Sequence, residues 1–229
     1  MSKADISLVL PCKNEEPTIG EVIEEARETF SGRKLQIVVP DNSTDRSPVI
    51  ASRLGALVVR PPRLGYGAAY RYAFRYCEGS LIGMMDPDGT YDVREMPLLL
   101  RPLEEGRADL VMGSRLRGAI DKGAMPWYKR RLGNPLLTLV LDVLFGLQVS
   151  DAHCGMRALT REALGRMNLK CDGMEFASEM LVEAARRRLR IEEVPISYRC
   201  RRGTPSKLSS IGDGWRHLRY MAMARLGMA

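Results

Sequence analysis

The sequence predicts an α/β protein with a Rossmann-like, mostly parallel sheet flanked by helices. Short apolar runs rich in β-branched residues alternate with longer segments of helical spacing, which is the pattern of parallel strands joined by covering helices. The 229 residues suit one domain, since one core usually serves chains of up to about 250 residues. Hydrophobic residues make up 45% of the chain and charged residues 28%, which excludes a disordered, collagen-like or coiled-coil chain.

Six short apolar runs have the length and composition of strands buried in a sheet. The first, Ile-Ser-Leu-Val-Leu, lies close to the N-terminus, and polar or turn-forming residues follow the runs. We expect strands, in chain order, at residues 6–10, 35–39, 56–59, 81–85, 109–112 and 191–196.

Segments with apolar residues at helical spacing separate these runs. They predict helices at residues 18–29, 47–54, 68–77, 96–105 and 179–188. Thr18 followed by Glu21 predicts a capping box at the start of the first helix. Residues 134–145 are apolar on most faces, which predicts a helix in the core or against another apolar surface.

The C-terminal segment differs in character from the rest of the chain. We expect one domain over residues 1–208 and a basic amphipathic helix over residues 209–229. Residues 215–226 mix Arg with Trp, Tyr, Met and Leu at helical spacing. Such a helix either lies on an anionic membrane surface or packs on the domain.

Cysteine usage and apolar runs predict a cytoplasmic protein. Five scattered cysteines, without a Cys-x-x-Cys pair, predict reduced and mostly buried thiols. The N-terminal residues lack the features of a signal peptide. The longest apolar stretch, residues 136–149, is shorter than the roughly 20 residues of a membrane-spanning helix.

The positive charge is concentrated at the C-terminal end. The net charge is +7, and residues 186–229 carry ten arginines, one lysine and three acidic residues. A basic end on a nearly neutral body predicts an anionic partner: nucleic acid, a phosphorylated substrate or membrane headgroups.

Polar residues follow the predicted strands where ligands usually bind in open α/β sheets, beyond the carboxyl ends. They occupy residues 11–16, 41–45, 86–89 and 113–115. The sequence contains no G-x-x-x-x-G-K-[ST], and the first turn, Pro-Cys-Lys-Asn-Glu-Glu, is not the G-x-G-x-x-G of a dinucleotide fold. These two observations argue against an NTPase and a dehydrogenase.

Asp86 and Asp88 flank Pro87 directly after a predicted strand. Mg²⁺ or Mn²⁺ prefers oxygen ligands and commonly binds one or two carboxylates together with phosphate oxygens. The pair therefore suits a metal-bridged diphosphate, although Asp-Pro-Asp-Gly is also good turn chemistry by itself.

An ordered set of motifs covers nearly the whole chain. The set comprises Leu-Pro-Cys-Lys-Asn-Glu-Glu (10–16), 41–45, Gly-Tyr-Gly-Ala-Ala (65–69), Asp-Pro-Asp-Gly-Thr-Tyr-Asp (86–92), Gly-Ser-Arg (113–115), 149–157, Gly-Met-Glu-Phe (173–176), 201–203 and Ser-Lys-Leu (206–208). It resembles glycosyltransferase family 2, in particular the dolichyl-phosphate mannose synthase-like and polyprenyl-phosphate glucosyltransferase-like enzymes. The resemblance implies the glycosyltransferase A fold and a catalytic domain over residues 1–208.

The resemblance also implies roles for the residues that bind the donor. Pro11 and Glu15 shape the nucleotide pocket, and Asp41 accepts a hydrogen bond from the base. Asp86 lies near the ribose or the metal, and Asp88 is the direct metal ligand. Many members have a second Asp at the position of Pro40, so the choice between uridine and guanosine stays open.

Two glycines and a set of basic residues complete the implied site. Gly65 and Gly67 either let the backbone approach the donor or form a simple turn. A phosphate monoester has a second pKa near 6, so a phosphate acceptor needs arginines more than a base. Guanidinium groups bind phosphate through paired hydrogen bonds. The candidate phosphate-binding residues are Arg115, Arg130, Arg131, Arg157, Arg201 and Lys207, and the resemblance implies that Arg115, one of Arg130 or Arg131, and Arg201 bind the phosphates.

Three further sites have more than one interpretation. Asp151 is a general base, a partner that orients an arginine, or a loop cap. His153 completes the metal site or is a core histidine. Glu175 and Glu179 are one helical turn apart; the resemblance places Glu175 beside the acceptor, and a surface helix is the alternative.

Together these observations predict an inverting, metal-dependent glycosyltransferase that moves a hexose from UDP-glucose or GDP-mannose to polyprenyl (dolichyl or undecaprenyl) phosphate, with Mg²⁺ or Mn²⁺, at the inner face of the membrane. One alternative is the same donor chemistry with a soluble sugar or natural-product hydroxyl. Another is a non-catalytic nucleotide-sugar or nucleic-acid binding protein, which the low aromatic content of 6% disfavours for nucleic acid. The sugar and the oligomeric state, a homodimer included, stay open.

Overall fold

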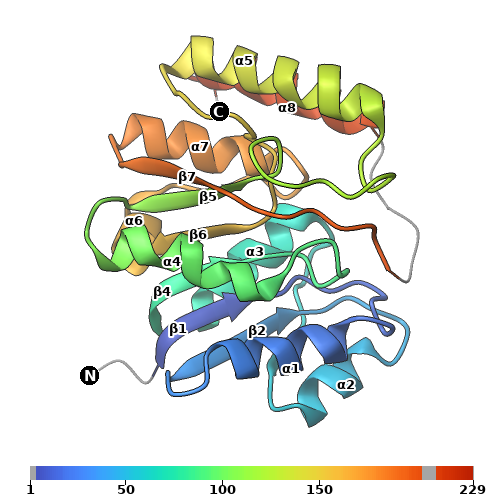
Figure 1. The fold of residues 1–229 in the computed structure, drawn as a ribbon. Coiled ribbons are helices and arrows are strands. Elements are labelled where there is room, and N and C mark those ends of the chain that lie inside the picture. Colours follow the sequence, from blue (N-terminus) through green and yellow to red (C-terminus); the bar gives the residue numbers. More distant parts are fainter. Residues whose placement is uncertain (1–3, 203–209, 229) are drawn as a thin grey trace.

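In the part of the chain that the structure describes, seven strands form one sheet in the order β3-β2-β1-β4-β6-β5-β7 (Figure 1). The computed structural model describes residues 4–202 and 210–228. The strands are β1 (Ala4–Val9), β2 (Leu35–Pro40), β3 (Leu57–Val59), β4 (Gly79–Met84), β5 (Leu110–Ser114), β6 (Arg157–Thr160) and β7 (Ile191–Pro195). All neighbouring pairs are parallel except the two made by β6, which runs antiparallel to β4 and β5.

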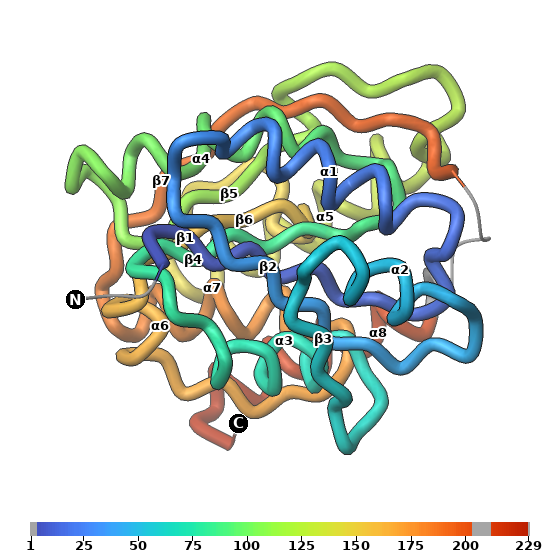
Figure 2. Tube along the Cα trace, turned by 90° about the horizontal axis from the view of Figure 1, so that it is seen from below, coloured from blue at the N-terminus to red at the C-terminus, as the bar shows by residue number. Residues whose placement is uncertain are grey.

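Helices cover both faces of this sheet. They are α1 (Ile19–Thr29), α2 (Ser47–Arg53), α3 (Tyr66–Ala73), α4 (Met96–Glu104), α5 (Asn134–Phe145), α6 (Arg161–Arg166), α7 (Phe176–Arg186) and α8 (Ser210–Arg225), with 3₁₀ turns at Phe74–Tyr76 and Val93–Glu95 and a π-helical turn at Lys129–Gly133. Helices α1, α2 and α4 cover one face, whereas α3, α6 and α7 cover the other (Figure 2). The central strands are buried on both faces, which explains their nearly continuous apolar sequences.

Helices α5 and α8 form a further layer beyond α7 (Figure 1). Tyr220, Met221 and Ala224 of α8 are buried. The expected C-terminal helix is therefore present and packs on the domain, while the predicted boundary at residue 208 lies outside the described residues. Across residues 4–202 and 210–228, no helix combines the length and the apolarity needed to cross a membrane.

The structure contains the six predicted strands and the predicted helices, with shifted ends, and adds two elements. Strand β6 and helix α6 were not predicted, because this strand has four residues and begins with an arginine, Arg157. The capping-box prediction is wrong, since Thr18 makes no side-chain cap and its hydroxyl donates to the carbonyl of Glu15.

Candidate active site

The carboxyl ends of β1, β2 and β4 meet at one edge of the sheet, because the three strands are parallel. Val9 of β1 is paired with Val38 of β2 and with Met84 of β4. An isolated bridge between Cys12 and Asp41 extends the β1–β2 pairing beyond the strands. The predicted donor-binding residues that follow these three strands therefore lie at this edge.

Asp88 is held in a fixed orientation by its own turn. Its Oδ1 accepts hydrogen bonds from the backbone nitrogen of Thr90 at 3.0 Å and from the Thr90 hydroxyl at 2.6 Å. Gly89, between them, has a φ of +76°, which favours glycine. Only 6% of Asp88 is exposed. The second oxygen, Oδ2, consequently points in one defined direction.

Asp86 lies two residues before Asp88 and is half-buried. Burial, and then the charge of Asp88, raise the pKa of the Asp86 carboxyl to about 7. The positive charges of Arg201 and Arg115 oppose this rise. Two adjacent acids that are costly to ionise together form a site that a cation would stabilise.

The chemistry of these two acids fits a hard divalent cation. Both offer carboxylate oxygens, which Mg²⁺ and Mn²⁺ prefer. In the described part of the chain, no group of three or more His, Cys, Asp or Glu side chains is placed to hold a metal ion. A pair of carboxylates suits an ion that takes its other ligands from the phosphate oxygens of a diphosphate.

Arg201 joins two of the strand ends. Its Nη1 donates to Oδ2 of Asp88 and its Nη2 to Oε1 of Glu15, each at 2.5 Å. The backbone nitrogen of Arg202 donates to the carbonyl of Asp88 at 3.2 Å, and that of Arg199 to the carbonyl of Thr90 at 2.8 Å. The segment after β7 thus follows the Asp88 turn and brings Arg201 to the predicted donor-binding residues.

Asp41 lies in a second turn at the end of β2. Its two oxygens accept hydrogen bonds from the backbone nitrogen of Ser43 at 2.9 Å and from the Ser43 hydroxyl at 2.7 Å. The backbone nitrogen of Asn14 donates to the same hydroxyl at 2.7 Å, so the turns after β1 and β2 are joined. Burial raises the pKa of Cys12, beside Asp41, to about 12, which keeps it a neutral thiol. Asp41 is thereby held in a fixed orientation at the end of β2, with lone pairs still available.

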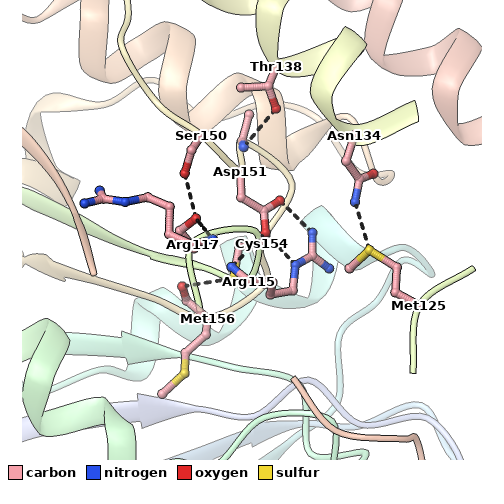
Figure 3. A network of polar contacts seen from close by, with 12 residues as sticks. Arg115, Arg117, Met125, Asn134, Thr138, Ser150, Asp151, Cys154 and Met156 are labelled. Carbon is pink, nitrogen blue, oxygen red and sulfur yellow. Dashed lines mark hydrogen bonds and ion pairs between the residues drawn. The ribbon is translucent and has the colours of Figure 1, made fainter. Parts of the chain in front are cut away.

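Arg115, after β5, forms a buried bidentate ion pair with Asp151 (Figure 3). Its Nε donates to Oδ2 at 2.7 Å and its Nη2 to Oδ1 at 2.8 Å, and its backbone nitrogen donates to Oδ2 at 3.1 Å. The guanidinium also lies over the ring of Tyr198, 5.2 Å from its centre. Burial opposes the charge, but Asp151 holds the pKa of Arg115 well above its usual value. Of the three interpretations of Asp151, the structure favours the partner that orients an arginine.

Comparisons with known proteins identify the family to which the chain belongs. The sequence model of the family described as "Glycosyl transferase family 2" matches residues 7–167, more than half of the chain. The chain belongs to glycosyltransferase family 2. The enzyme class and the glycosyltransferase A fold expected from the sequence are thereby confirmed.

Two relatives of this glycosyltransferase come from Haloferax volcanii. The low-salt glycan biosynthesis hexosyltransferase Agl6 is 47% identical over 218 residues, which cover 94% of this chain and 52% of the relative, so the chain spans about half of its length. A dolichyl-phosphate hexose transferase is 34% identical over 212 residues, 92% of this chain and 89% of the relative. Among solved structures, glucosyl-3-phosphoglycerate synthase from Mycobacterium tuberculosis, in complex with Mn²⁺, UDP and phosphoglyceric acid, superposes with a TM-score of 0.77 at 26% identity, covering 99% of this chain and 80% of that one.

Arg157 does not belong to the phosphate-binding set in which the sequence placed it. It is 2% exposed, and its guanidinium donates to the carbonyls of Cys154 at 2.9 Å, Ala177 at 2.9 Å and Ala152 at 2.8 Å. The guanidinium therefore joins the loop at residues 152–154 to α7 inside the core. The prediction for Arg157 was wrong because the sequence does not show which groups surround a side chain in the folded protein.

The two predicted glycines are required by chain packing. A Cβ on Gly65 would lie 2.1 Å from the carbonyl oxygen of Asp172, and one on Gly67 would lie 2.3 Å from that of Cys171. Residues 171–172 therefore approach the start of α3 closely. The expected contact of these glycines with the donor stays a prediction.

The remaining predicted residues lie in different settings. Glu179 is buried and accepts hydrogen bonds from the backbone nitrogens of Lys170 at 2.8 Å and Cys171 at 2.9 Å, so it is a loop cap. Glu175 accepts one from Gly173 at 3.2 Å. Arg130 and Arg131 are exposed on the turn before α5. Lys207 lies outside the described residues. For Glu175, Arg130 and Arg131, binding to the acceptor stays a prediction.

His153 joins a buried cluster that connects the Asp151 loop with α8. The hydroxyl of Ser178, on α7, lies 3.3 Å from Nε2 of His153 and 2.8 Å from Nδ1 of His217. The two imidazole rings are 4.3 Å apart. Burial, and then the nearby charge of Arg157, lower the pKa of His217 to about 4. The structure therefore favours the core histidine over the metal ligand for His153.

Stability is expected to fall in acid because of His217. Its pKa is lower in the folded chain than the unfolded value near 6.5, so the unfolded chain binds more protons between about pH 6.5 and 4. The free energy of unfolding should fall by up to about 3 kcal/mol from this group as pH drops through that range. Urea unfolding at pH 7 and pH 5 measures the fall, which should be smaller in His217→Asn and unchanged in Arg216→Asn. An equal fall in all three proteins would contradict it.

Sequence reasoning missed several residues of the site. Thr90 orients Asp88, Tyr198 supports Arg115, and Tyr91 accepts a hydrogen bond from the backbone nitrogen of Gly155 at 2.8 Å. Glu193 binds two backbone amides of the Asp151 loop. The sequence around Tyr198 contains no pattern that indicates its role. Glu193 could have been noticed, because acidic residues are unusual within a predicted buried strand.

Proposed function

We propose that this glycosyltransferase moves a hexose, with inversion, from a nucleotide diphosphate sugar to a polyprenyl phosphate. The observation that carries the proposal is the Arg115–Asp151 pair. Its carboxylate is fully buried and bidentately bound, which leaves it poorly suited to take a proton from a hydroxyl acceptor. A phosphate acceptor needs no such base, because it is already largely ionised at neutral pH.

Asp86 and Asp88 are the residues that would hold Mg²⁺ or Mn²⁺. When bound, the metal supplies positive charge that stabilises the diphosphate leaving group. Asp41 accepts a hydrogen bond from the base, and Pro11, Glu15, Gly65 and Gly67 line the donor pocket. The solved M. tuberculosis structure contains Mn²⁺ together with UDP, which supports a metal and a nucleotide diphosphate as the ligands of the proposed site.

Arginines provide the acceptor side of the proposed site. Arg201 is positioned by Glu15 and Asp88, and Arg115 by Asp151. Both are partly or fully buried, so a bound phosphate would meet them with little competing water. Arg130, Arg131 and Lys207 extend the same proposal with cations that attract the anionic acceptor. The name of the H. volcanii dolichyl-phosphate hexose transferase supports a lipid phosphate.

An anionic membrane surface, at the cytoplasmic face, is the proposed location. Leu132, Leu136, Leu139 and Val143 share one face of the α5 segment and are 57–75% exposed. Lys129, Arg130 and Arg131 precede them, and the exposed Trp215 lies on α8, which packs on α5. Apolar side chains next to cations suit a bilayer surface with anionic headgroups.

Leu139→Glu should weaken binding to vesicles that contain phosphatidylglycerol about tenfold or more, because one buried leucine contributes about 1.5–3 kcal/mol. Co-sedimentation of the purified chain measures this change. Leu98→Glu, on α4, places the same charge at another leucine that is 50% exposed, and is the control. Equal binding by both variants would remove α5 from the proposed surface.

The decisive experiment offers one donor and two classes of acceptor. The purified chain is incubated with radiolabelled UDP-glucose or GDP-mannose, Mg²⁺ or Mn²⁺, and either undecaprenyl or dolichyl phosphate or a panel of soluble sugars and phosphorylated small molecules. We expect a labelled lipid that is cleaved by mild acid. Phosphoglyceric acid, bound in the M. tuberculosis complex, supports a soluble phosphorylated compound as the second candidate acceptor. Label only in the soluble fraction would overturn the lipid acceptor.

A further inference from the structure

Glu193 is a buried carboxylate on β7, next to the loop that carries Asp151. Its side chain is 7% exposed. Its Oε1 and Oε2 both accept from the backbone nitrogen of Ser150 at 2.8 Å, and Oε1 also accepts from that of Asp151 at 3.1 Å. Arg117, which is 53% exposed, lies 3.8 Å away. Burying a carboxylate is costly unless hydrogen bonds compensate it, and here two consecutive amides do so.

The same loop is tied to the strand end that carries Arg115. The hydroxyls of Ser114 and Ser150 lie 2.6 Å apart. The backbone nitrogen of Arg115 donates to Asp151 (Figure 3). A continuous series of contacts therefore runs from Glu193 through the amides of Ser150 and Asp151 to the Asp151 carboxylate and then to the guanidinium of Arg115. A shift of the loop by about an ångström would take that carboxylate out of hydrogen-bond range of Arg115.

We propose that Glu193 is a positioning residue for glycosyl transfer: by binding the amides of Ser150 and Asp151, it fixes the carboxylate that holds Arg115 in place. The consequence for the acceptor rests on the proposed function, whereas the consequence for Arg115 itself does not. Position 193 matters and position 192 does not, because consecutive residues of a strand face opposite sides. Glu192 instead pairs with Arg107 at the surface.

Two variants test this inference by kinetics. Glu193→Gln removes the negative charge and, with its oxygen in the place of Oε1, puts an NH₂ group in the place of Oε2 against the amide of Ser150. Glu193→Ala removes both acceptors. We expect the acceptor kcat/KM to fall about 10-fold in the first and about 100-fold in the second, the range typical of residues that orient a functional side chain. The donor KM should stay within about twofold of wild type. Glu192→Gln is the matched control and should keep wild-type kinetics.

Combining variants separates positioning from general damage. If Glu193 acts through Arg115, Glu193→Gln should cost much less in an Arg115→Lys background than in wild type. A merely structural role would give additive losses and would lower both acceptor and donor parameters. Additive losses would therefore overturn the inference.

A nuclear magnetic resonance measurement is independent of the acceptor. In the ¹⁵N-arginine-labelled protein, the Nε proton of Arg115 should exchange slowly because it is buried against Asp151, and Arg115→Lys assigns it by loss. Glu193→Gln should shift this signal and speed its exchange, and Glu192→Gln should leave it unchanged. An unchanged signal in Glu193→Gln would overturn the inference. A changed signal in a chain that does not glycosylate lipid phosphate would instead refute the proposed acceptor and uphold Glu193.

Discussion

Asp88→Asn should lower the rate of hexose transfer by about 10³-fold or more. The substitution keeps an oxygen for the Thr90 backbone and hydroxyl, so the turn is preserved, but it removes the charge that would hold a divalent cation against the leaving diphosphate. Losing one stabilising group for a developing anion commonly costs about 10²–10³-fold by itself. Turnover at saturating donor, with Mg²⁺ or Mn²⁺, measures the effect.

Calorimetry gives this prediction a second readout. In wild type, Mn²⁺ should strengthen the binding of the nucleotide diphosphate, and it should do so more as pH rises through about 7, because Asp86 must lose its proton to bind a cation. In Asp88→Asn the metal should add little at any pH. Asp109→Asn is the control, because it removes a carboxylate that is paired with Arg190 at the amino end of β5, whereas the site lies at the carboxyl ends of the strands. Full activity in Asp88→Asn would contradict the proposal that Asp88 holds the divalent cation.

Asp151→Ala should lower the free energy of unfolding by about 3–5 kcal/mol. It leaves the guanidinium of Arg115 buried and without its bidentate partner, and removing one member of a buried pair is strongly destabilising. Transfer should be lost as well, since Arg115 no longer has a fixed orientation. Urea unfolding of the purified chain measures the change in stability.

The double variant Arg115→Met/Asp151→Leu separates the two effects. Replacing a buried ion pair by apolar side chains of similar volume is often neutral or stabilising, so the double variant should regain most of the stability that Asp151→Ala loses. It should stay about 1–3 kcal/mol below wild type, because the backbone nitrogen of residue 115 loses its acceptor at position 151. Transfer should remain absent, because the guanidinium is gone. An unchanged urea midpoint in Asp151→Ala would contradict a buried ion pair between Arg115 and Asp151.

The sequence predicted the parts of the fold that depend on local pattern. The strand at residues 35–39 corresponds to β2, and the helix at 134–145 to α5. Asp86 and Asp88 could be found because the chemistry of the turn lies within three consecutive residues. Strand β6 could not, since its pairing with β4 and β5 is set by distant partners, and its first side chain, Arg157, is polar.

Most of the site's geometry depends on contacts between residues that are far apart in the chain. Arg115 and Asp151 are 36 residues apart, and Ser150 and Glu193 are 43 apart. Nothing in the local sequence states which acid meets which arginine, so Arg157 appeared equivalent to Arg115. The groups around each arginine distinguish the two, because Arg157 is bound to carbonyls and Arg115 to a carboxylate.

The position of Arg201 has a consequence for how tightly a divalent ion can bind. The guanidinium already neutralises the outward oxygen of Asp88 and shares its charge with Glu15. A divalent ion that took Oδ2 of Asp88 as its ligand would compete with the guanidinium for that oxygen, so its dissociation constant would reflect an exchange of cations. The guanidinium would keep its contact with Glu15, and the phosphate of an arriving substrate could take the place of Asp88 as its second anionic partner.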